Sequence, residues 1–392
     1  MSAPYIDTYN TVLVPTKSLD LAIIGGGCAG LSLARELAER QTSRSVMILE
    51  PRTHYQDDRS WCFWAPQQHA LSHLVSHTWN AWLFGQHDQP NEKRGSVSHP
   101  YQYIRSSDFY QDCWKHIEQC PAIESCLGTS VLKLERQLDG WRIETDRECL
   151  FATHVIDTRP PSPQQFAQAT LYQSFLGVEI ELGNEIIIDH LSIELMSDMQ
   201  VVNGDYCFTY LLPFSKNRIL IEHTVFSAQP VTAENLQKPL NLLLEKRGLN
   251  TTPIIRTEHA ILPMGLPMEN TELPRAGIGG GALRPSSGYG FMRIQGWARD
   301  CATQFSEQGI LSPHIDSGFI LPHMDQLFLK VLRLQPQLTP TLFQQLLGQA
   351  DTERFIRFMT DKANFFDYLN IISSLPKTPF IRALFSTYFK ST

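Results

Sequence analysis

A glycine-rich turn near the start of the chain constrains the fold more than any other feature. The mostly apolar residues 19–24 predict a strand covered on both faces, and residues 25–30 follow with the spacing G-x-G-x-x-G. Gly25 permits a tight turn, Gly27 lets the backbone approach a pyrophosphate, and Gly30 lets the next helix pack closely on the strand. The free N–H groups at the start of that helix favour phosphate.

An acidic residue stands at the distance that a bound ribose requires. Residues 45–49 form a second apolar run, and Glu50 ends it twenty residues beyond Gly30. A carboxylate there suits a ribose 2′-hydroxyl and would repel a 2′-phosphate. Glycine-rich turns also occur where no nucleotide binds, but strand, helix, second strand and acid in one register favour a dinucleotide site. The motif itself does not separate FAD from NAD.

Composition and charge exclude several classes of function. The 392 residues are 42% hydrophobic and 19% charged, as in a folded soluble protein, and the net charge of −7 argues against nucleic acid as a partner. The eight cysteines form no C-x-x-C pair and no metal-like spacing with histidine, so we expect reduced thiols and no metal site. The chain has no signal-like start and no apolar run long enough to span a membrane, which predicts a cytoplasmic location.

The chain changes architecture along its length. Strand-like runs between 171 and 226 predict an antiparallel sheet, unlike the covered strands of the opening segment. A second glycine-rich turn at 276–290 and a helix at 291–308 predict a return to the nucleotide-binding unit. Beyond residue 322 the sequence is helical and aromatic. We therefore expect an α/β fold with a Rossmann-like domain, an antiparallel-sheet substrate domain and a helical C-terminal region.

Five motifs in one order point to a known family. The chain resembles the lycopene cyclases, FAD-containing carotenoid cyclases related to flavin hydroxylases and geranylgeranyl reductases. Many flavoproteins share the glycine fingerprint, whereas the elements Asp-Arg-x-Trp-Cys-Phe-Trp and Pro-Ser-x-Gly-Tyr are more specific together. The matching segments are 25–30 with Glu50, 58–64, 155–159, 220–224 and 284–289.

The resemblance implies a division of the chain into an FAD-binding domain of the flavin hydroxylase and geranylgeranyl reductase type and a separate substrate domain. Flavin hydroxylases carry a Gly-Asp pair near the second glycine-rich turn, and this chain has Gly281-Ala282 there instead, which weakens the hydroxylase interpretation. The expected segments are 1–85, 86–165 and 256–321 for the FAD-binding domain, 166–255 for the substrate sheet and 322–392 for the helical region.

The resemblance also implies a reaction without net oxidation or reduction. A proton is added to the terminal double bond of lycopene, an internal double bond attacks the cation to close a β-ring, and a proton is lost. FAD is implied in its reduced form, with NADPH or NADH as the reductant. Two alternatives stay open: a flavin-dependent hydroxylase or prenyl reductase that consumes NAD(P)H, and a non-catalytic flavin-binding carotenoid carrier.

Glu222 falls where the family carries its proposed acid/base. Protonating an alkene needs a carboxyl that keeps its proton near neutral pH, and burial beside hydrocarbon raises a carboxyl pKa in that direction. Many relatives have a second acid directly after this glutamate, whereas this chain has His223. Neighbouring side chains on a strand point to opposite faces, so we expect Glu222 to point inward. The alternative is a glutamate on an edge strand in solvent.

Residues around the flavin and the substrate follow from the same resemblance. Arg59 is expected at the flavin, with a salt bridge to Asp57 or Asp58 as the alternative. Asp157 is expected near the adenosine or pyrophosphate, or as a turn cap, and Tyr289 near substrate or in the core. The remaining expected cofactor-binding residues are Gly280, Gly281, Pro285 and Gly288, and the other expected substrate-lining residues are Trp61, Phe63 and Trp64.

The C-terminal region predicts contact with a lipid surface. Residues 322–392 contain eight Lys or Arg against five Asp or Glu, and phenylalanines accompany these basic residues. A basic amphipathic helix favours anionic lipid, although the same phenylalanines suit a core. A long polyene is almost insoluble in water, so the enzyme must collect it from lipid. We therefore expect a peripheral protein on the inner face of the membrane; the oligomeric state stays open.

Overall fold

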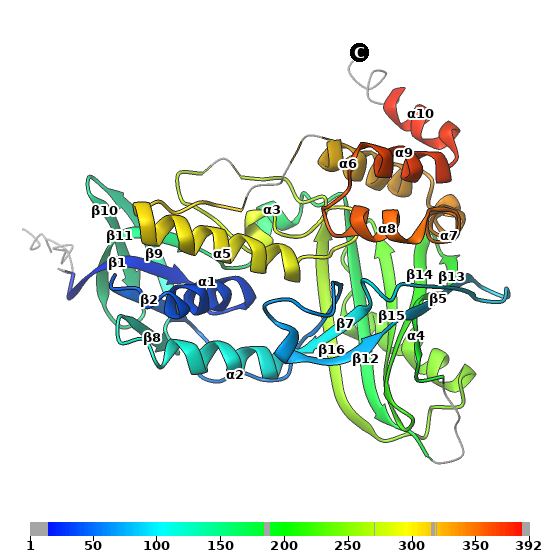
Figure 1. Ribbon diagram of the computed structural model, residues 1–392, viewed down its shortest axis with the longest axis horizontal. Helices are drawn as coiled ribbons and strands as arrows, with labels where there is room; N and C mark the ends of the chain where they lie inside the picture. The colour runs from blue at the N-terminus through cyan, green and yellow to red at the C-terminus, as the bar shows by residue number, and fades with distance from the viewer. Residues whose placement is uncertain (1–14, 184–188, 270, 315–317, 319, 386–392) are drawn as a thin grey trace, which may run out of the picture.

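Two large sheets lie side by side along the long axis of the molecule, and helices pack on each (Figure 1). The computed structural model describes residues 15–183, 189–269, 271–314, 318 and 320–385. The first sheet comes mainly from the N-terminal part of the chain, and the second comes mainly from its middle. The α/β class expected from the sequence is confirmed.

The first sheet is the unit that the glycine spacing predicts. In the spatial order given below, the first four strands run parallel to one another, the fifth is antiparallel to the fourth, and the sixth is antiparallel to the fifth. Three helices pack on one face, namely α1 (Cys28–Glu39), α2 (Ser106–Ile117) and α5 (Phe291–Gln308) (Figure 1). In spatial order the strands are β8 (Ile123–Leu127), β2 (Val46–Glu50), β1 (Lys17–Ile24), β11 (Cys149–Asp157), β10 (Gly140–Thr145) and β9 (Val131–Gln137).

The second sheet has seven strands and is antiparallel except between β13 and β5. The strands at 81–86 and 92–95 extend this sheet, although the sequence analysis placed both in the FAD-binding segments. Residues 184–188, which were expected to belong to the sheet, lie outside the described residues. In spatial order the strands are β16 (Ile254–Met264), β12 (Leu171–Glu181), β15 (Arg218–Ser227), β14 (Asp205–Ser215), β13 (Ser192–Val202), β5 (Ala81–Gln86) and β6 (Glu92–Gly95).

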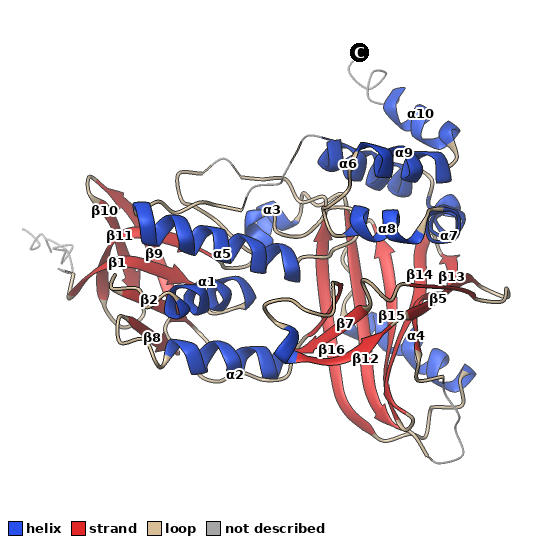
Figure 2. Ribbon diagram, in the orientation of Figure 1, coloured by secondary structure: helices blue, strands red, loops and turns tan. Residues whose placement is uncertain are grey.

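The two faces of the large sheet carry different layers. Helix α4 (Ala233–Lys246) packs on one face and buries leucines against it. The C-terminal helices share a hydrophobic core with the opposite face and lie toward one end of the strands (Figure 2). These helices are α6 (Ile320–Leu334), α7 (Thr339–Gln349), α8 (Thr352–Met359), α9 (Phe365–Ser374) and α10 (Lys377–Phe385).

Smaller elements connect these layers. A three-stranded sheet contributes aromatic residues to the cores of both halves, because alternate side chains of its first strand point in opposite directions. The short helix α3 (Pro163–Phe166) follows β11. The strands of the small sheet are β3 (Ser60–Trp64), β7 (Tyr101–Arg105) and β4 (Val75–Trp79).

Candidate active site

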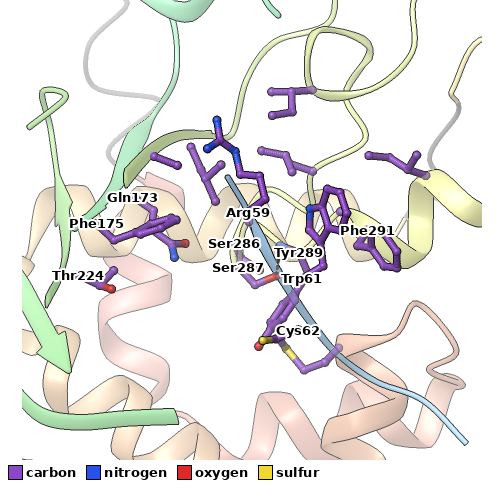
Figure 3. A pocket seen from close by; sticks show the side chains of 18 of the residues that line it. Arg59, Trp61, Cys62, Gln173, Phe175, Thr224, Ser286, Ser287, Tyr289 and Phe291 are labelled. Carbon is purple, nitrogen blue, oxygen red and sulfur yellow. Dashed lines mark hydrogen bonds between the residues drawn. The ribbon is translucent and has the colours of Figure 1, made fainter. Parts of the chain in front are cut away.

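One cavity connects the glycine turn after β1 with the C-terminal helices. Its volume is about 1150 Å3, and residues of both large sheets line it. Figure 3 shows Gln173, Phe175 and Thr224 on the side of the large sheet and Trp61 beside Phe291 on the other side. The cavity is therefore placed to bring a group bound at the turn next to a second molecule held against the large sheet.

The glycine turn forms a cradle at one end of this cavity. A Cβ on Gly30 would lie 2.0 Å from the carbonyl oxygen of Gly25, so only glycine lets α1 approach β1 this closely. Gly27 precedes the first residue of α1, and no atom lies within 4 Å of the position that its Cβ would take. No side chain caps the helix, so its first N–H groups face open space that suits a phosphate.

Glu50 is buried at the end of β2 and lines the same cavity. Its carboxylate accepts hydrogen bonds from the backbone N–H of Gly26 and from the guanidinium of Arg52, the latter at 2.7 Å. Burial alone would raise the pKa of Glu50, but these hydrogen bonds outweigh it and lower the pKa below its ordinary value. The carboxylate is therefore negative at neutral pH, as the sequence pattern requires for a ribose partner.

The second glycine-rich turn lies against the middle of the cavity. Its anchor is Arg284, which is almost completely buried and binds the carboxylate of Asp325 on α6 with a distance of 3.0 Å. Gly288 has a φ of +70°, which glycine adopts without strain. Tyr289 follows it, lines the cavity and shares a hydroxyl–hydroxyl hydrogen bond of 2.9 Å with Tyr101. The turn thus presents backbone and one phenol to the cavity.

Several residues expected at the cofactor lie outside the cavity lining. Asp157 accepts hydrogen bonds from the backbone N–H and side chain of Arg159, at 3.0 and 2.9 Å, and so caps the turn after β11. Gly280 is packed against the backbone of Arg275, and Gly281 against Met268. The cavity passes Ser286, Ser287 and Gly288 instead, and Pro285 is not among its lining residues. Close packing of the turn explains these glycines without a ligand.

Arg59 lies at the rim of the cavity with its side chain about half exposed. Its guanidinium donates to the carbonyl oxygen of Asp58 at 2.6 Å and lies 3.8 Å from the Asp58 carboxylate. The salt bridge considered as the alternative is therefore present, and the rim position still places the charge beside the cavity.

Alternation along β3 separates its aromatic residues. Cys62 and Trp64 face the cavity, and Trp61 also reaches it while stacking on Phe291 with ring centroids 4.9 Å apart. Phe63 does not line the cavity: it is buried in the core of the first half and also stacks with Phe291, with ring centroids 5.5 Å apart. The substrate role expected of Phe63 is thus corrected, because strand geometry turns it away from Cys62 and Trp64.

Glu222 points from the middle of β15 into the cavity, and only 8% of its surface is exposed. Leu220, Thr224 and Phe226, at alternate positions of the same strand, line the cavity with it. Burial raises the pKa of Glu222 well above its usual range, a hydrogen bond and the negative charge of the neighbouring Glu258 raise it further, and Arg256 opposes them. Burial and the second carboxyl therefore both favour the protonated form of Glu222.

His223 belongs to the opposite face of the sheet. It does not line the cavity, and the residues on either side of it in the strand do. Burial lowers the pKa of His223, which disfavours its charged form. The expectation that Glu222 and His223 point apart agrees with this arrangement.

Two polar residues of the cavity were not expected from the sequence. Glu258 on β16 is 5% exposed, and Tyr210 on β14 lies directly opposite Glu222. The alternation of β16 could have pointed to Glu258, because Glu258, Ala260 and Leu262 lie on one face of this strand, and that face lines the cavity. An acid on the apolar face of a strand is unusual unless it has a partner.

The other end of the cavity is apolar. Side chains from the large sheet and from five helices surround it, and most of them are apolar, which suits a hydrocarbon. The helix residues that line it are Leu327, Phe328, Phe343, Leu346, Leu347, Phe355, Phe358, Met359, Ile371, Leu375, Phe380 and Ile381.

Comparison with protein families identifies the relatives of this chain. The sequence profile described as "Lycopene cyclase protein" matches residues 20–385, which is nearly the whole chain and includes both glycine turns, Glu222 and Glu258. The chain belongs to the lycopene cyclase family. Membership in the lycopene cyclase family confirms the resemblance that the ordered motifs indicated.

Curated relatives in the lycopene cyclase family are moderately similar in sequence. The lycopene beta-cyclase of Pseudescherichia vulneris is 27% identical over 69% of this chain and 70% of its own length. The lycopene beta cyclase of Synechococcus elongatus is 25% identical over 69% of this chain and 68% of its own. The chloroplastic enzyme of Arabidopsis thaliana is 26% identical over 73% of this chain, but the match spans only 59% of that protein.

Solved structures show the fold that this lycopene cyclase family member shares with flavoenzymes. A geranylgeranyl bacteriochlorophyll reductase-like protein from Thermoplasma acidophilum superposes with a TM-score of 0.58 at 12% identity, over 95% of this chain and 97% of that one. The flavin-dependent monooxygenase PieE, solved with FAD and substrate, gives a TM-score of 0.59 at 12% identity, and the match covers 92% of this chain and 71% of PieE. The predicted fold type is therefore confirmed.

The described part of this lycopene cyclase family member has no helix of the length and apolar character needed to cross a membrane.

Proposed function

We propose that this protein is a lycopene β-cyclase that closes the linear ends of lycopene by acid–base chemistry without net oxidation or reduction. The observation that carries the proposal is a buried carboxyl, Glu222, that contacts a second carboxyl and faces an apolar cavity that continues into a dinucleotide cradle. Family membership and the named relatives support the same reaction.

The reaction begins with proton transfer from Glu222. The O–H bond breaks as a C–H bond forms at the terminal alkene, and the tertiary cation is closed into a six-membered ring by an internal double bond. Water would capture such a cation, so the apolar lining must exclude it. The aromatic faces of Trp61 and Trp64 add stabilisation of about 2 kcal/mol when desolvated. Transfer of a ring proton to the Glu222 carboxylate completes the β-ring and restores the O–H bond of Glu222, with no net change in protons or electrons.

The residues of the cradle fit FAD. Gly27 borders open space at the N-terminus of α1, Glu50 is a buried carboxylate, and Ser287 to Gly290 lie against the middle of the same cavity. When bound in its reduced form, the flavin supplies an electron-rich neighbour to a cation. We propose NADPH or NADH as the reductant. The glycine turn and Glu50 would hold the adenosine half of FAD, and the second turn would hold the flavin half.

The C-terminal helices supply a route for the substrate from lipid. Exposed apolar side chains gather on α9 and α10, and Ile372, Ile381 and Leu384 are both exposed and part of the cavity lining. The cavity therefore reaches the surface at this patch, which also carries the exposed Lys377 and Arg382. We propose that this face contacts anionic lipid on the inner side of the membrane and takes up the carotenoid there.

The test of the reaction is pigment conversion. Expression in a lycopene-accumulating bacterium is expected to give β-carotene or its one-ended analogue, identified by chromatography and mass spectrometry. Glu222→Gln keeps the shape of the side chain but cannot donate the proton, so the pigment should stay linear while the purified variant retains flavin. Oxygenated or saturated product with stoichiometric NAD(P)H consumption would instead show a hydroxylase or reductase. Binding of flavin and polyene without conversion would show a carrier.

The lipid contact has its own test. Replacing the exposed Phe365 and Phe366 of α9 with serine should reduce co-sedimentation with anionic phospholipid vesicles. The matched control is Leu138→Ser, because Leu138 is 95% exposed on the far sheet. Equal vesicle binding by both variants and the unchanged protein would contradict the proposed contact face.

A further inference from the structure

A row of side chains crosses four strands of the large sheet at the level of Glu222. Gly177 on β12 is paired with Glu222 on one side and with Glu258 on the other, and Tyr210 is paired with Glu222 beyond it. Directly paired residues project to the same face of a sheet, so the whole row faces the cavity. The two carboxyl groups are therefore separated only by a residue that has no side chain.

The missing side chain of Gly177 lets the two carboxyl groups meet. A Cβ at that position would lie 2.5 Å from the Cγ atom of Glu222, closer than side chains tolerate. Without it, Glu222 leans across the middle strand and hydrogen-bonds Glu258. Two carboxyls in such contact cannot both be ionised at low cost, so one carries a proton.

Glu258 is fixed by other groups as the charged member of the pair. The guanidinium of Arg256 and the hydroxyl of Ser60 both donate to its Oε2 atom, each at 2.7 Å. Arg256 in turn binds the fully buried Glu179 at 3.0 Å. A carboxylate has lone pairs for further donors, so Glu258 can still accept a hydrogen bond from the O–H group of protonated Glu222.

Glu258 also borders a second, polar pocket, here called the outer pocket. This pocket has a volume of about 650 Å3 and reaches the surface at exposed Gln56 and Ile255. Glu258 lines both the outer pocket and the apolar cavity. The other polar or charged residues of the outer pocket are Asp57, Asp58, Arg59, Arg105, Ser107, Asp108, Arg256, Thr257 and His259.

We propose that Glu258 is a positioning residue that accepts the hydrogen bond of Glu222, holds the proton on it, and exchanges that proton with water in the outer pocket. This inference rests on the proposed cyclase reaction and assigns a second residue to it. After Glu222 has given its proton to the alkene and taken one back from the ring, Glu258 relays that proton to water in the outer pocket and a solvent proton to Glu222 in return. The proton on Glu222 is thereby exchanged without water entering the hydrocarbon end of the cavity.

The groups that face Glu222 determine the sign of its pH dependence. From β16 come the negative Glu258 and the positive Arg256, from β14 the phenol of Tyr210, and from β3 the thiol of Cys62. Glu258 raises the pKa of Glu222, so Glu258→Gln lowers it and leaves less of the acid protonated at neutral pH. The alkaline limb of the kcat profile then moves to lower pH.

The experiment compares kcat and KM against pH for wild-type holoenzyme, Glu258→Gln and a control, with lycopene in phospholipid vesicles. The limb for Glu258→Gln is expected at least about one pH unit lower, which is about a tenfold loss of kcat above it, with KM and flavin content unchanged. The control is Glu194→Gln, at a partly buried glutamate of β13 that binds Arg247 and does not line the cavity. Its limb should stay in place.

Proton exchange gives a second readout that a structural defect would not imitate. Enzyme equilibrated in H2O is mixed into D2O with lycopene, and the deuterium in the first ring formed is measured by mass spectrometry at increasing delays. Glu258→Gln should take up deuterium more slowly than wild type. Glu258→Asp keeps the negative charge but has one methylene fewer. The alkaline limb of its kcat profile should therefore lie between those of wild type and Glu258→Gln. This variant also serves as the test if Glu258→Gln does not fold.

Three results would be decisive. An unchanged limb and unchanged deuterium uptake in Glu258→Gln, or in Glu258→Asp if the first does not fold, would overturn the inference. A uniform loss of kcat at every pH would also overturn it, because that result shows only a structural role. If wild type forms no ring in the same assay, the proposed function itself fails, and this outcome is separate from the other two.

Discussion

Two buried glutamates that line one cavity have pKa values displaced in opposite directions. Glu50 receives a backbone N–H and a guanidinium, which hold its pKa below the ordinary value. Glu222 has hydrocarbon on one side and a second carboxyl on the other, which raise its pKa well above that value. The same side chain is thus favoured as an anion in one place and as a neutral acid in the other, and the groups around it decide which.

The largest effect is expected from closing the gap between the carboxyls. Gly177→Ala places a Cβ where Glu222 now leans, which pushes it from Glu258 and from its position in the cavity. We expect cyclisation to fall by about a hundredfold or more, the range in which a misplaced general acid acts. Turnover of purified enzyme measures this loss. Gly183→Ala is the control, because no atom of the described residues, apart from its chain neighbours, lies within 4 Å of its Cβ position. Equal turnover in both variants would show that the gap has no role.

A smaller effect is expected at the other glutamate. Glu50→Gln removes the negative charge at the ribose position, so we expect the flavin dissociation constant to rise about tenfold, the value of one charged hydrogen bond. Fluorescence titration of the apoprotein with FAD measures it, and turnover at saturating FAD should remain. Glu124→Gln, an exposed acid on the neighbouring β8, is the control. If Glu50→Gln lost turnover at saturating FAD while its affinity for FAD stayed unchanged, Glu50 would act in the reaction and not in flavin binding, which would contradict this comparison.

The smallest effect concerns stability against pH. The pKa of Glu222 is raised in the folded protein, so its contribution to stability is complete below the unfolded carboxyl pKa and is lost as pH rises through the raised value. The free energy of unfolding of wild type relative to Glu222→Gln should therefore fall over that window, by about 1.4 kcal/mol for each pH unit between the unfolded and folded pKa values. Denaturant titrations at a series of pH values measure the difference. A constant difference would show that Glu222 has an ordinary pKa.

The sequence predicted the parts of this site that are local in the chain. Gly25, Gly27 and Gly30 lie within one turn, so their spacing alone defines the cradle. The orientation of Glu222 also follows from the alternation of a single strand, although its role as the acid stays a prediction.

The parts that sequence reasoning did not predict depend on pairing between distant segments. Glu258 meets Glu222 only because β12 lies between their strands and has a glycine at that register. The burial of Phe63 could not be known either, since β3 faces the cavity on one side and the core of α5 on the other. Strand 81–86 joined the large sheet through parallel pairing with β13, which no local pattern marks.

The protonation state of Glu222 is the central claim, and infrared difference spectroscopy tests it directly. Spectra of the holoenzyme recorded near neutral pH should contain the carbonyl stretch of a protonated carboxylic acid that moves in D2O and disappears in Glu222→Gln. The same band should persist in Glu194→Gln, whose ion pair with Arg247 keeps that carboxylate charged in wild type. A wild-type spectrum with only carboxylate bands assignable to position 222 would contradict the account.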